Sequence, residues 1–169
     1  RGRHASAARA SPVVERGRPA PLGGAMAAVL LTLADAETPV WLDAGESAAR
    51  WARFHAGCPL ADDPARAEFL FAAAGAPPAL DRLPPGTEEE PHRSATLVIG
   101  VGALTEGEGW CLSGPGIERA HRLRVEGLPA EFLGAWAANA ARFPCGVDVI
   151  LCAGDRLAAL PRTVRIEEN

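Results

Sequence analysis

The sequence contains no lysine, no tyrosine and no glutamine, and all 17 of its basic residues are arginine. A chain without lysine cannot form a Schiff base with a carbonyl compound. This absence excludes a self-contained pyridoxal-phosphate enzyme and a lysine-dependent aldolase. We therefore expect no cofactor of this kind, and no other motif in the sequence predicts one.

A basic excess and a long apolar run are also missing. The formal net charge is -4 and the isoelectric point is near 5.6, whereas nucleic-acid-binding domains normally carry a basic excess. The longest apolar stretch, residues 25–34, is well short of the roughly 20 residues that a membrane span needs, and no signal peptide is visible. These absences predict a cytoplasmic protein without a nucleic-acid or membrane partner.

Cysteine is scarce, and its spacing fits neither a disulfide framework nor a CxxC zinc knuckle. His55 and His92 are further candidate metal ligands, but no second close pair completes a site. The sequence therefore predicts no metal site and reduced thiols at four positions: Cys58, Cys111, Cys145 and Cys152.

The residues that are present indicate one packed core. Of the 169 residues, 48% are hydrophobic and 22% charged, which is typical of a globular chain and too apolar for a disordered one. We predict a single domain over residues 1–169. Residues 1–15 are interpreted as an incomplete N-terminal helix or a remnant of cloning, because the chain begins without methionine.

Apolar periodicity predicts a mixed α/β domain with two or three layers, in which helices flank a mixed sheet. A capping box of Asp43 and Glu46 is expected to begin the second helix. The strands 96–101, 110–113 and 123–126 are expected to form an antiparallel ladder or meander. The nearly all-apolar segment 147–153 is expected to be a central strand buried on both faces, and the last two strands a closing hairpin around Pro161 and Arg162. The predicted helices are 24–34, 46–56 and 129–142; the predicted strands are 39–43, 69–71, 96–101, 110–113, 123–126, 147–153, 157–160 and 163–166.

Residues 75–93 hold five prolines and three consecutive glutamates, which predicts a long surface loop. Loops of this length are uncommon unless they bind something, although a charge run is more often a solvated surface. Exposed tryptophans also favour interfaces. The candidate partner-contact residues are therefore Trp41, Glu88, Glu89, Glu90, Arg93 and Trp110.

The segment Ser113–Ile117 is the most distinctive loop of the sequence. Its backbone N–H groups at the end of a strand are able to face an anion, and Ser113, Gly114 and Gly116 are the candidate contacts; the alternative is a tight turn that needs positive φ at the glycines. Arginine forks suit phosphate or phosphonate oxygens, so Arg122, Arg124 and Arg162 are further candidates, against the alternative of ordinary surface arginines. No acid, base and nucleophile set is visible, so no catalytic residue is predicted.

Seven short segments also follow one another in an order that resembles a known family. The segments are Glu37–Asp43, Phe54–Leu60, Gly86–Thr87 with Pro91 and Ser94–Leu97, Leu112–Ile117, Gly127–Phe132, Phe143–Asp148 and Leu157–Thr163. Together they are similar to the PhnH family, whose members are a subunit of the bacterial carbon-phosphorus lyase system. The stretch before Pro19 is similar to the family's Arg-Pro-Gly-Arg-Pro start, with a departure at Glu15 and Arg16.

This resemblance implies a reduced pyridoxal-phosphate-transferase-like fold without the cofactor site. It implies a homodimer when the protein is isolated, and assembly with the partner subunits PhnG, PhnI and PhnJ. The complex couples an alkylphosphonate to the ribose C1 of ATP with release of adenine, before a separate iron-sulfur, radical SAM subunit breaks the carbon-phosphorus bond. The resemblance carries over no catalytic residue.

Two functions are therefore in competition. The first is a subunit of this transferase complex that is inactive alone and acts through its interfaces in alkylphosphonate catabolism. The second is a stand-alone module that binds phosphate, phosphonate or a nucleotide with the 113–117 loop and nearby arginines.

Overall fold

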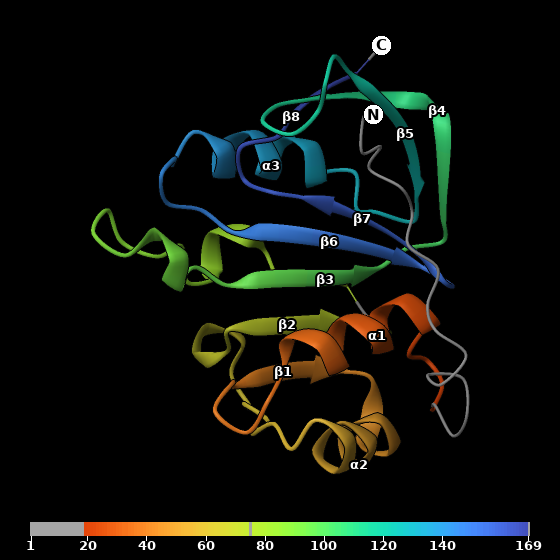
Figure 1. Cartoon of the computed structure of the whole chain (residues 1–169), viewed down its shortest axis with the longest axis vertical. Coiled ribbons are helices and arrows are strands. Elements are labelled where there is room, and N and C mark those ends of the chain that lie inside the picture. Colours follow the sequence, from red (N-terminus) through yellow and green to blue (C-terminus); the bar gives the residue numbers. More distant parts are fainter. Residues whose placement is uncertain (1–18, 75, 169) are drawn as a thin grey trace.

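The computed structural model describes residues 19–74 and 76–168, and the predicted N-terminal segment 1–15 lies outside them. The described chain forms an α/β fold with two sheets (Figure 1). Short 3-10 turns occur at 64–66, 80–82 and 91–93. The helices and strands are α1 (Gly24–Leu33), β1 (Val40–Asp43), α2 (Gly45–His55), β2 (Phe69–Ala72), β3 (Thr96–Gly100), β4 (Ala103–Ser113), β5 (His121–Glu126), α3 (Phe132–Ala140), β6 (Asp148–Ala153), β7 (Arg156–Leu160) and β8 (Arg165–Glu167).

The larger sheet has five strands in the order β1-β2-β3-β6-β7. Strands β1, β2, β3 and β6 are parallel, and β7 returns antiparallel to β6 through a tight turn. Strand β6 lies between two neighbours, and its residues Val149 and Leu151 are fully buried. The prediction of a central strand at 147–153 is therefore confirmed, and its burial explains why the segment is apolar along nearly its whole length.

The smaller sheet has three antiparallel strands in the order β5-β4-β8. It packs with α3 on one face of the larger sheet, whereas α1 and α2 cover the opposite face (Figure 1). Two apolar clusters, one on each face of the larger sheet, make up the core. The structure thus confirms a mixed α/β fold with three layers. No helix in the described part of the chain is both long and apolar enough to cross a bilayer.

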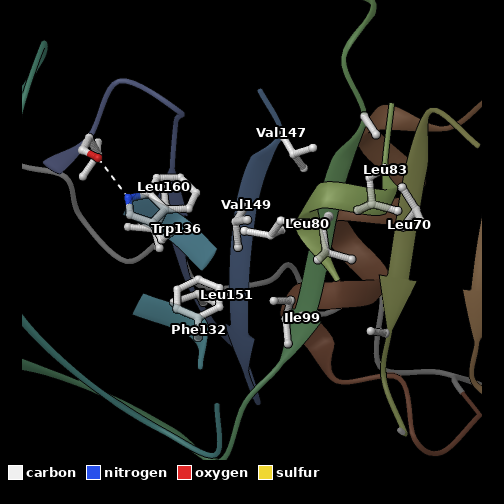
Figure 2. Packing of buried hydrophobic residues seen from close by; sticks show 14 of the residues in the cluster. Leu70, Leu80, Leu83, Ile99, Phe132, Trp136, Val147, Val149, Leu151 and Leu160 are labelled. Atoms are coloured by element: carbon white, nitrogen blue, oxygen red, sulfur yellow. Dashed lines mark hydrogen bonds between the residues drawn. The ribbon is translucent and has the colours of Figure 1, made fainter. Parts of the chain in front are cut away.

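The cluster beside α3 is built around large side chains from α3 and the strands of the larger sheet (Figure 2). Leu104, Leu112 and Leu123 of the smaller sheet also belong to it. Phe132 stacks between Trp110 and Trp136, with ring centroids 6.0 Å and 6.2 Å apart. The buried Trp136 indole N–H donates to the carbonyl oxygen of Val164 at 3.0 Å, the dashed contact in Figure 2. This bond satisfies a polar group that would otherwise be costly to bury, and it fixes α3 against the segment that leads into β8.

The helices begin and end close to the predicted residues, but two details of the prediction are wrong. Helix α2 begins at Gly45 after Ala44, and no side chain caps it; Asp43 belongs to β1 instead, so the expected capping box does not form. Helix α3 begins at Phe132, three residues after Pro129. Helix α2 still ends as predicted, with the positive φ of Gly57 (68°) directly after it.

Strand pairing differs from the expected ladder and hairpin. Of the three strands expected to form the ladder, β3 joins the parallel sheet between β2 and β6, and β4 and β5 pair antiparallel. Strands β7 and β8 enter different sheets, since β7 pairs with β6 and β8 with β4. The closing hairpin is therefore wrong: the turn at Pro161 carries the chain from one sheet to the other.

Candidate functional site

Arg162 ties together three segments that are distant in the sequence. Its Nε and Nη2 donate to the two carboxylate oxygens of Asp148 at 3.2 and 2.8 Å, and its Nη1 donates to the carbonyl oxygens of Pro91 and Pro144 at 2.9 and 3.3 Å. Its backbone N–H also donates to Asp148 at 2.7 Å. The side chain is only 13% exposed. Four of its five N–H donors are thus used within the protein, so this candidate anion ligand acts mainly as a clamp between the loop before β3, the turn before β6 and the turn after β7.

The loop Ser113–Ile117 follows β4, as predicted, and its glycines have the positive φ values that the tight-turn alternative requires. Gly114 has φ 147° and Gly116 has φ 86°. A Cβ at position 114 would lie 3.0 Å from the carbonyl oxygen of Thr163, so the loop crosses the segment before β8 at a distance that only glycine allows. The loop closes with a hydrogen bond of 3.1 Å from the N–H of Ile117 to the carbonyl oxygen of Gly114.

This loop separates two hollows. The first, which we call the inter-sheet pocket, lies between β4 and β5 of the smaller sheet and β7 of the larger one, and has a volume of about 380 Å³. Most of its wall is aliphatic. Its lining residues are Leu104, Glu106, Leu112, Pro115, Gly116, Ile117, His121, Leu123, Arg156, Leu157, Ala158, Ala159, Pro161 and Val164.

Three ionisable side chains line the inter-sheet pocket. Arg156 donates from Nη1 to the carbonyl oxygen of Leu104 at 3.1 Å, and its Nη2 lies 4.0 Å from the Glu106 carboxylate. Among the interactions of the described residues, the side chains of Glu106, which is 48% exposed, and His121 have no hydrogen-bond partner. The pocket thus presents an acceptor and an imidazole that are available to a bound molecule. The sequence analysis missed this pocket, because its polar residues come from three strands and share no spacing motif.

The second hollow, which we call the loop hollow, lies on the other side of Pro115 and beside the end of α3. Its volume is about 490 Å³. No carboxylate is among the described residues that line it, although Asp148 lies behind Arg162. Arg165, which the sequence analysis did not single out, is exposed there and has no carboxylate partner in the described chain. The lining residues are Ser113, Gly114, Pro115, Ala140, Phe143, Arg162, Thr163 and Arg165.

The structure brings some of the predicted anion contacts together and separates others. Ser113, Gly114 and Arg162 all line the loop hollow, whereas Gly116 lines the inter-sheet pocket. Arg122 and Arg124 share one face of β5, as predicted, but they line neither hollow. Their neighbours His121 and Leu123 face the inter-sheet pocket, so the two arginines point to the opposite, exposed face. Arg124 is paired there with Glu108 and Glu126, at 3.4 and 3.6 Å.

The candidate partner contacts are spread over the surface. Glu88 and Glu89 are exposed, and Glu90 forms an ion pair with Arg93 at 3.0 Å within the same loop. Trp41 on the edge strand β1 and Trp110 on β4 are both half-buried, because their rings pack against the core cluster beside α3. The acidic loop is therefore the most accessible of these candidates, while the two tryptophans contribute to the core.

Two other aromatic side chains are far more exposed. Phe54 on α2 is 83% exposed and Phe143 after α3 is 63% exposed. The helical spacing of Phe54 with Ala48, and of Phe143 with Phe132 and Trp136, predicts that both rings lie on buried stripes. The structure contradicts this, since the buried residues of α2 are Ala48 and Ala52 and α3 ends at Ala140, before Phe143. Phe143 lines the loop hollow. Exposed aromatic rings of this kind are enriched at interfaces.

The four cysteines are free, and two of them, Cys58 and Cys152, are buried. Burial raises the pKa of the Cys152 thiol to about 12, and burial also raises the pKa of Cys58. Both thiols are therefore protonated near neutral pH, which makes them poor nucleophiles. Across residues 19–74 and 76–168, no three or more His, Cys, Asp or Glu side chains gather closely enough to hold a metal ion.

The fold and these two hollows define an α/β protein with small-molecule-sized cavities and, within its described residues, no assembled catalytic set. The family model described as "Bacterial phosphonate metabolism protein (PhnH)" matches residues 4–167. The chain belongs to the PhnH family.

Two relatives support this assignment. The chain is 44% identical over 155 residues to "Alpha-D-ribose 1-methylphosphonate 5-triphosphate synthase subunit PhnH" of Rhizobium meliloti (strain 1021), which covers 89% of this chain and 78% of that protein. It is also 40% identical over 84 residues to "Putative C-P lyase subunit protein HtxG" of Stutzerimonas stutzeri, which covers 48% of this chain and 42% of that relative.

Proposed function

We propose that this chain is a subunit of a carbon-phosphorus lyase core complex, which couples an alkylphosphonate to the ribose C1 of ATP and releases adenine. The observation that carries the proposal is the 44% identity to a synthase subunit over most of both chains. Its partners are PhnG, PhnI and PhnJ, and the isolated chain is a cytoplasmic homodimer without a cofactor. The fold is a reduced version of the pyridoxal-phosphate-transferase fold, and the absence of lysine supports the loss of the cofactor site.

In this function the chain acts through its surface. Two features support such a role: the exposed acidic loop around Glu88 and Glu89, and the exposed rings of Phe54 and Phe143. Aromatic residues at the centre of an interface carry much of the binding free energy, and complementary charges direct the encounter. The described residues supply exposed aromatic rings and exposed charges on the surface. No nucleophile is hydrogen-bonded to a base among them.

Co-expression of the tagged chain with PhnG, PhnI and PhnJ tests this proposal. We expect the three proteins to co-purify with the chain, and we expect phosphonate- and ATP-dependent release of adenine only from the assembled complex. A Phe54→Ala, Phe143→Ala double variant should lose most of the co-purified partners. Leu31→Ala, which truncates a less exposed apolar residue, is the matched control. Turnover of a phosphonate by the lone chain, or failure of the wild-type chain to retain any partner, would overturn the proposal.

A second candidate function is a module that binds small phosphorylated or phosphonate anions by itself. The loop hollow favours it, since Ser113 and Thr163 offer hydroxyl groups there, Arg165 offers an exposed guanidinium, and no carboxylate lines it. Calorimetry with ATP, ribose 5-phosphate and methylphosphonate tests this function. Binding should be lost in Arg165→Ala and retained in Arg122→Ala, which lies outside the hollow. Absence of heat with all three compounds would reject it.

A further inference from the structure

The inter-sheet pocket exists because a small residue stands where two sheets face each other. Packed sheets lie about 10 Å apart, and side chains normally fill the space between them. On the face of β7 that is turned toward the smaller sheet, Ala158 stands between Arg156 and the buried Leu160. A methyl group at this position leaves open the space that a longer side chain would fill. The resulting cavity, about 380 Å³, falls within the range of small-molecule sites.

The wall of the pocket selects for an apolar body. Leucine, isoleucine, valine and proline side chains from five segments surround it, and alanine and glycine complete the wall. Water in such a cavity finds few hydrogen-bond partners, so an apolar molecule that replaces it gains the hydrophobic free energy of its own buried surface. An aromatic ring suits this wall, because a rigid apolar body buries much surface and loses little conformational freedom on binding.

The polar groups of the pocket select against an anion. The positive charge of Arg156 is offset by the carboxylate of Glu106 at 4.0 Å, and one of the guanidinium donors is already bonded to the carbonyl oxygen of Leu104. A phosphate or phosphonate in the pocket would therefore meet a carboxylate beside the arginine. In contrast, the Glu106 carboxylate, whose side chain is 48% exposed, accepts no hydrogen bond among the described residues, so at the mouth of the pocket it is available to an N–H or O–H donor of a bound molecule.

From these observations we propose that the inter-sheet pocket binds an uncharged aromatic ring compound with a ring N–H, which donates to Glu106. The aliphatic wall holds the ring. His121, whose imidazole has no partner in the described chain, contacts the polar edge of the ring together with Glu106. This site is separate from the loop hollow and from the candidate partner surface. It requires no other subunit for binding, so the isolated chain is sufficient for its test.

Benzimidazole is a suitable probe, because it is flat, uncharged at mildly alkaline pH and carries one ring N–H. Titration of the isotope-labelled chain, followed by backbone amide NMR, should shift the resonances of Ile117, His121 and Ala158 at the pocket. The analogue 1-methylbenzimidazole has the same ring but no donor. We expect it to bind about tenfold more weakly, the effect of losing one hydrogen bond to a charged group.

Two isosteric variants test the role of the carboxylate without a change in side-chain volume. Glu106→Gln should weaken benzimidazole binding about tenfold, since the charged acceptor is lost. Glu108→Gln, two residues along the same strand but outside the pocket and paired with Arg124, should bind like the wild-type chain. Ala158→Leu should abolish binding by filling the pocket, and its folding is checked by the dispersion of the same amide spectrum.

Three outcomes would overturn the proposal. The first is the absence of saturable shifts at the pocket with benzimidazole. The second is equal binding of both ring compounds, or equal affinity of the Glu106→Gln and wild-type chains, since the hydrogen bond would then contribute nothing. The third is displacement of benzimidazole from the pocket by methylphosphonate, because the site would then be selective for anions. None of these outcomes bears on the co-purification of partner subunits.

Discussion

The buried thiol of Cys152 makes the stability of this protein depend on pH in a range where few other groups titrate. Burial raises the pKa of this thiol from 9.0 to about 12 in the folded chain. Since the sequence has no lysine and no tyrosine, thiols are the main side chains that ionise between about pH 9 and pH 12. The alkaline limb of the stability curve therefore reports on the cysteines.

The sign and size of the effect follow from proton linkage. Below pH 9 the thiol is protonated in both states, so its contribution to stability is fully present. Above pH 9 the unfolded chain releases the proton while the folded chain retains it, and the free energy of unfolding falls by about 1.4 kcal/mol per pH unit. The expected loss from Cys152 is about 1.4 kcal/mol at pH 10 and about 2.7 kcal/mol at pH 11. The buried Cys58, whose pKa is also raised, adds to the loss in the same direction.

The variant Cys152→Ala isolates this contribution. At pH 7 we expect it to be about 1 to 2 kcal/mol less stable than the wild-type chain, because a buried atom is removed from the core. As the pH rises the gap should close, so that the two stability curves meet near pH 10 to 11. Urea unfolding under reducing conditions, repeated at several pH values between 7 and 11, measures the gap directly.

Val149→Ala is the matched control, since it truncates a buried residue of the same strand that carries no ionisable group. Its stability should lie below that of the wild-type chain by a constant amount at every pH. A gap between the wild-type and Cys152→Ala chains that stays constant from pH 7 to pH 11 would refute the reasoning, because the raised pKa would then have no energetic counterpart.

Three further predictions concern stability, and urea unfolding measures each of them. Arg162→Met should lower the free energy of unfolding by about 2 to 3 kcal/mol. This is less than the loss for a fully buried ion pair, because the side chain of its partner Asp148 is 32% exposed. An unchanged midpoint of urea unfolding would contradict the clamp. Asn139→Ala should lower the free energy of unfolding by about 2 kcal/mol or more, since the side-chain amide accepts from the N–H of Val147 at 2.8 Å and donates to its carbonyl oxygen at 2.9 Å. A loss of less than half of this value would show that water replaces the amide. Gly109→Ala should cost clearly more than Gly107→Ala: both have positive φ, but only at 109 does a Cβ approach other atoms, within 2.7 Å of Arg124.

The elements with the strongest sequence pattern were predicted well. Helix α1 and strand β6 are apolar over nearly their whole length, and both proved to be buried at or close to the predicted residues. Strand β2, predicted from only three residues, also exists. These segments are determined by local hydrophobicity, which the sequence shows directly.

Strand partners and exposed aromatics were not predictable in the same way. Strands β3 and β4 follow each other with only two residues between them, yet they enter different sheets, and no local pattern encodes that choice. Phe54 and Phe143 lie at helical spacing from buried residues, but the layer that would cover them is absent from the described chain. Periodicity identifies which residues share a face and does not say whether another element packs on it.

The candidate site was predicted in part. The turn at residues 113–117 and its glycines were visible from composition alone, because few other sequences permit such a turn. In contrast, Glu106, His121 and Arg156 come from β4, β5 and β7 and meet only through the pairing of these strands. The ion pair between Arg162 and Asp148 could not be predicted either, since the two residues are 14 positions apart. Asp148 begins β6 and Arg162 follows the end of β7, so the pairing of these two strands brings them together.

Arg162 acts only as a hydrogen-bond donor in its clamp, and this limits which residues can replace it. An exchange of the two charges, Asp148→Arg with Arg162→Asp, would keep one positive and one negative group at the same place. The carbonyl oxygens of Pro91 and Pro144 now accept hydrogen bonds from the guanidinium at position 162, and a carboxylate there has no proton to give them. We therefore expect the exchanged pair to restore the charge balance without restoring the stability, because both carbonyls lose this donor and that of Pro91 keeps only the longer bond of 3.3 Å from the N–H of Ser94.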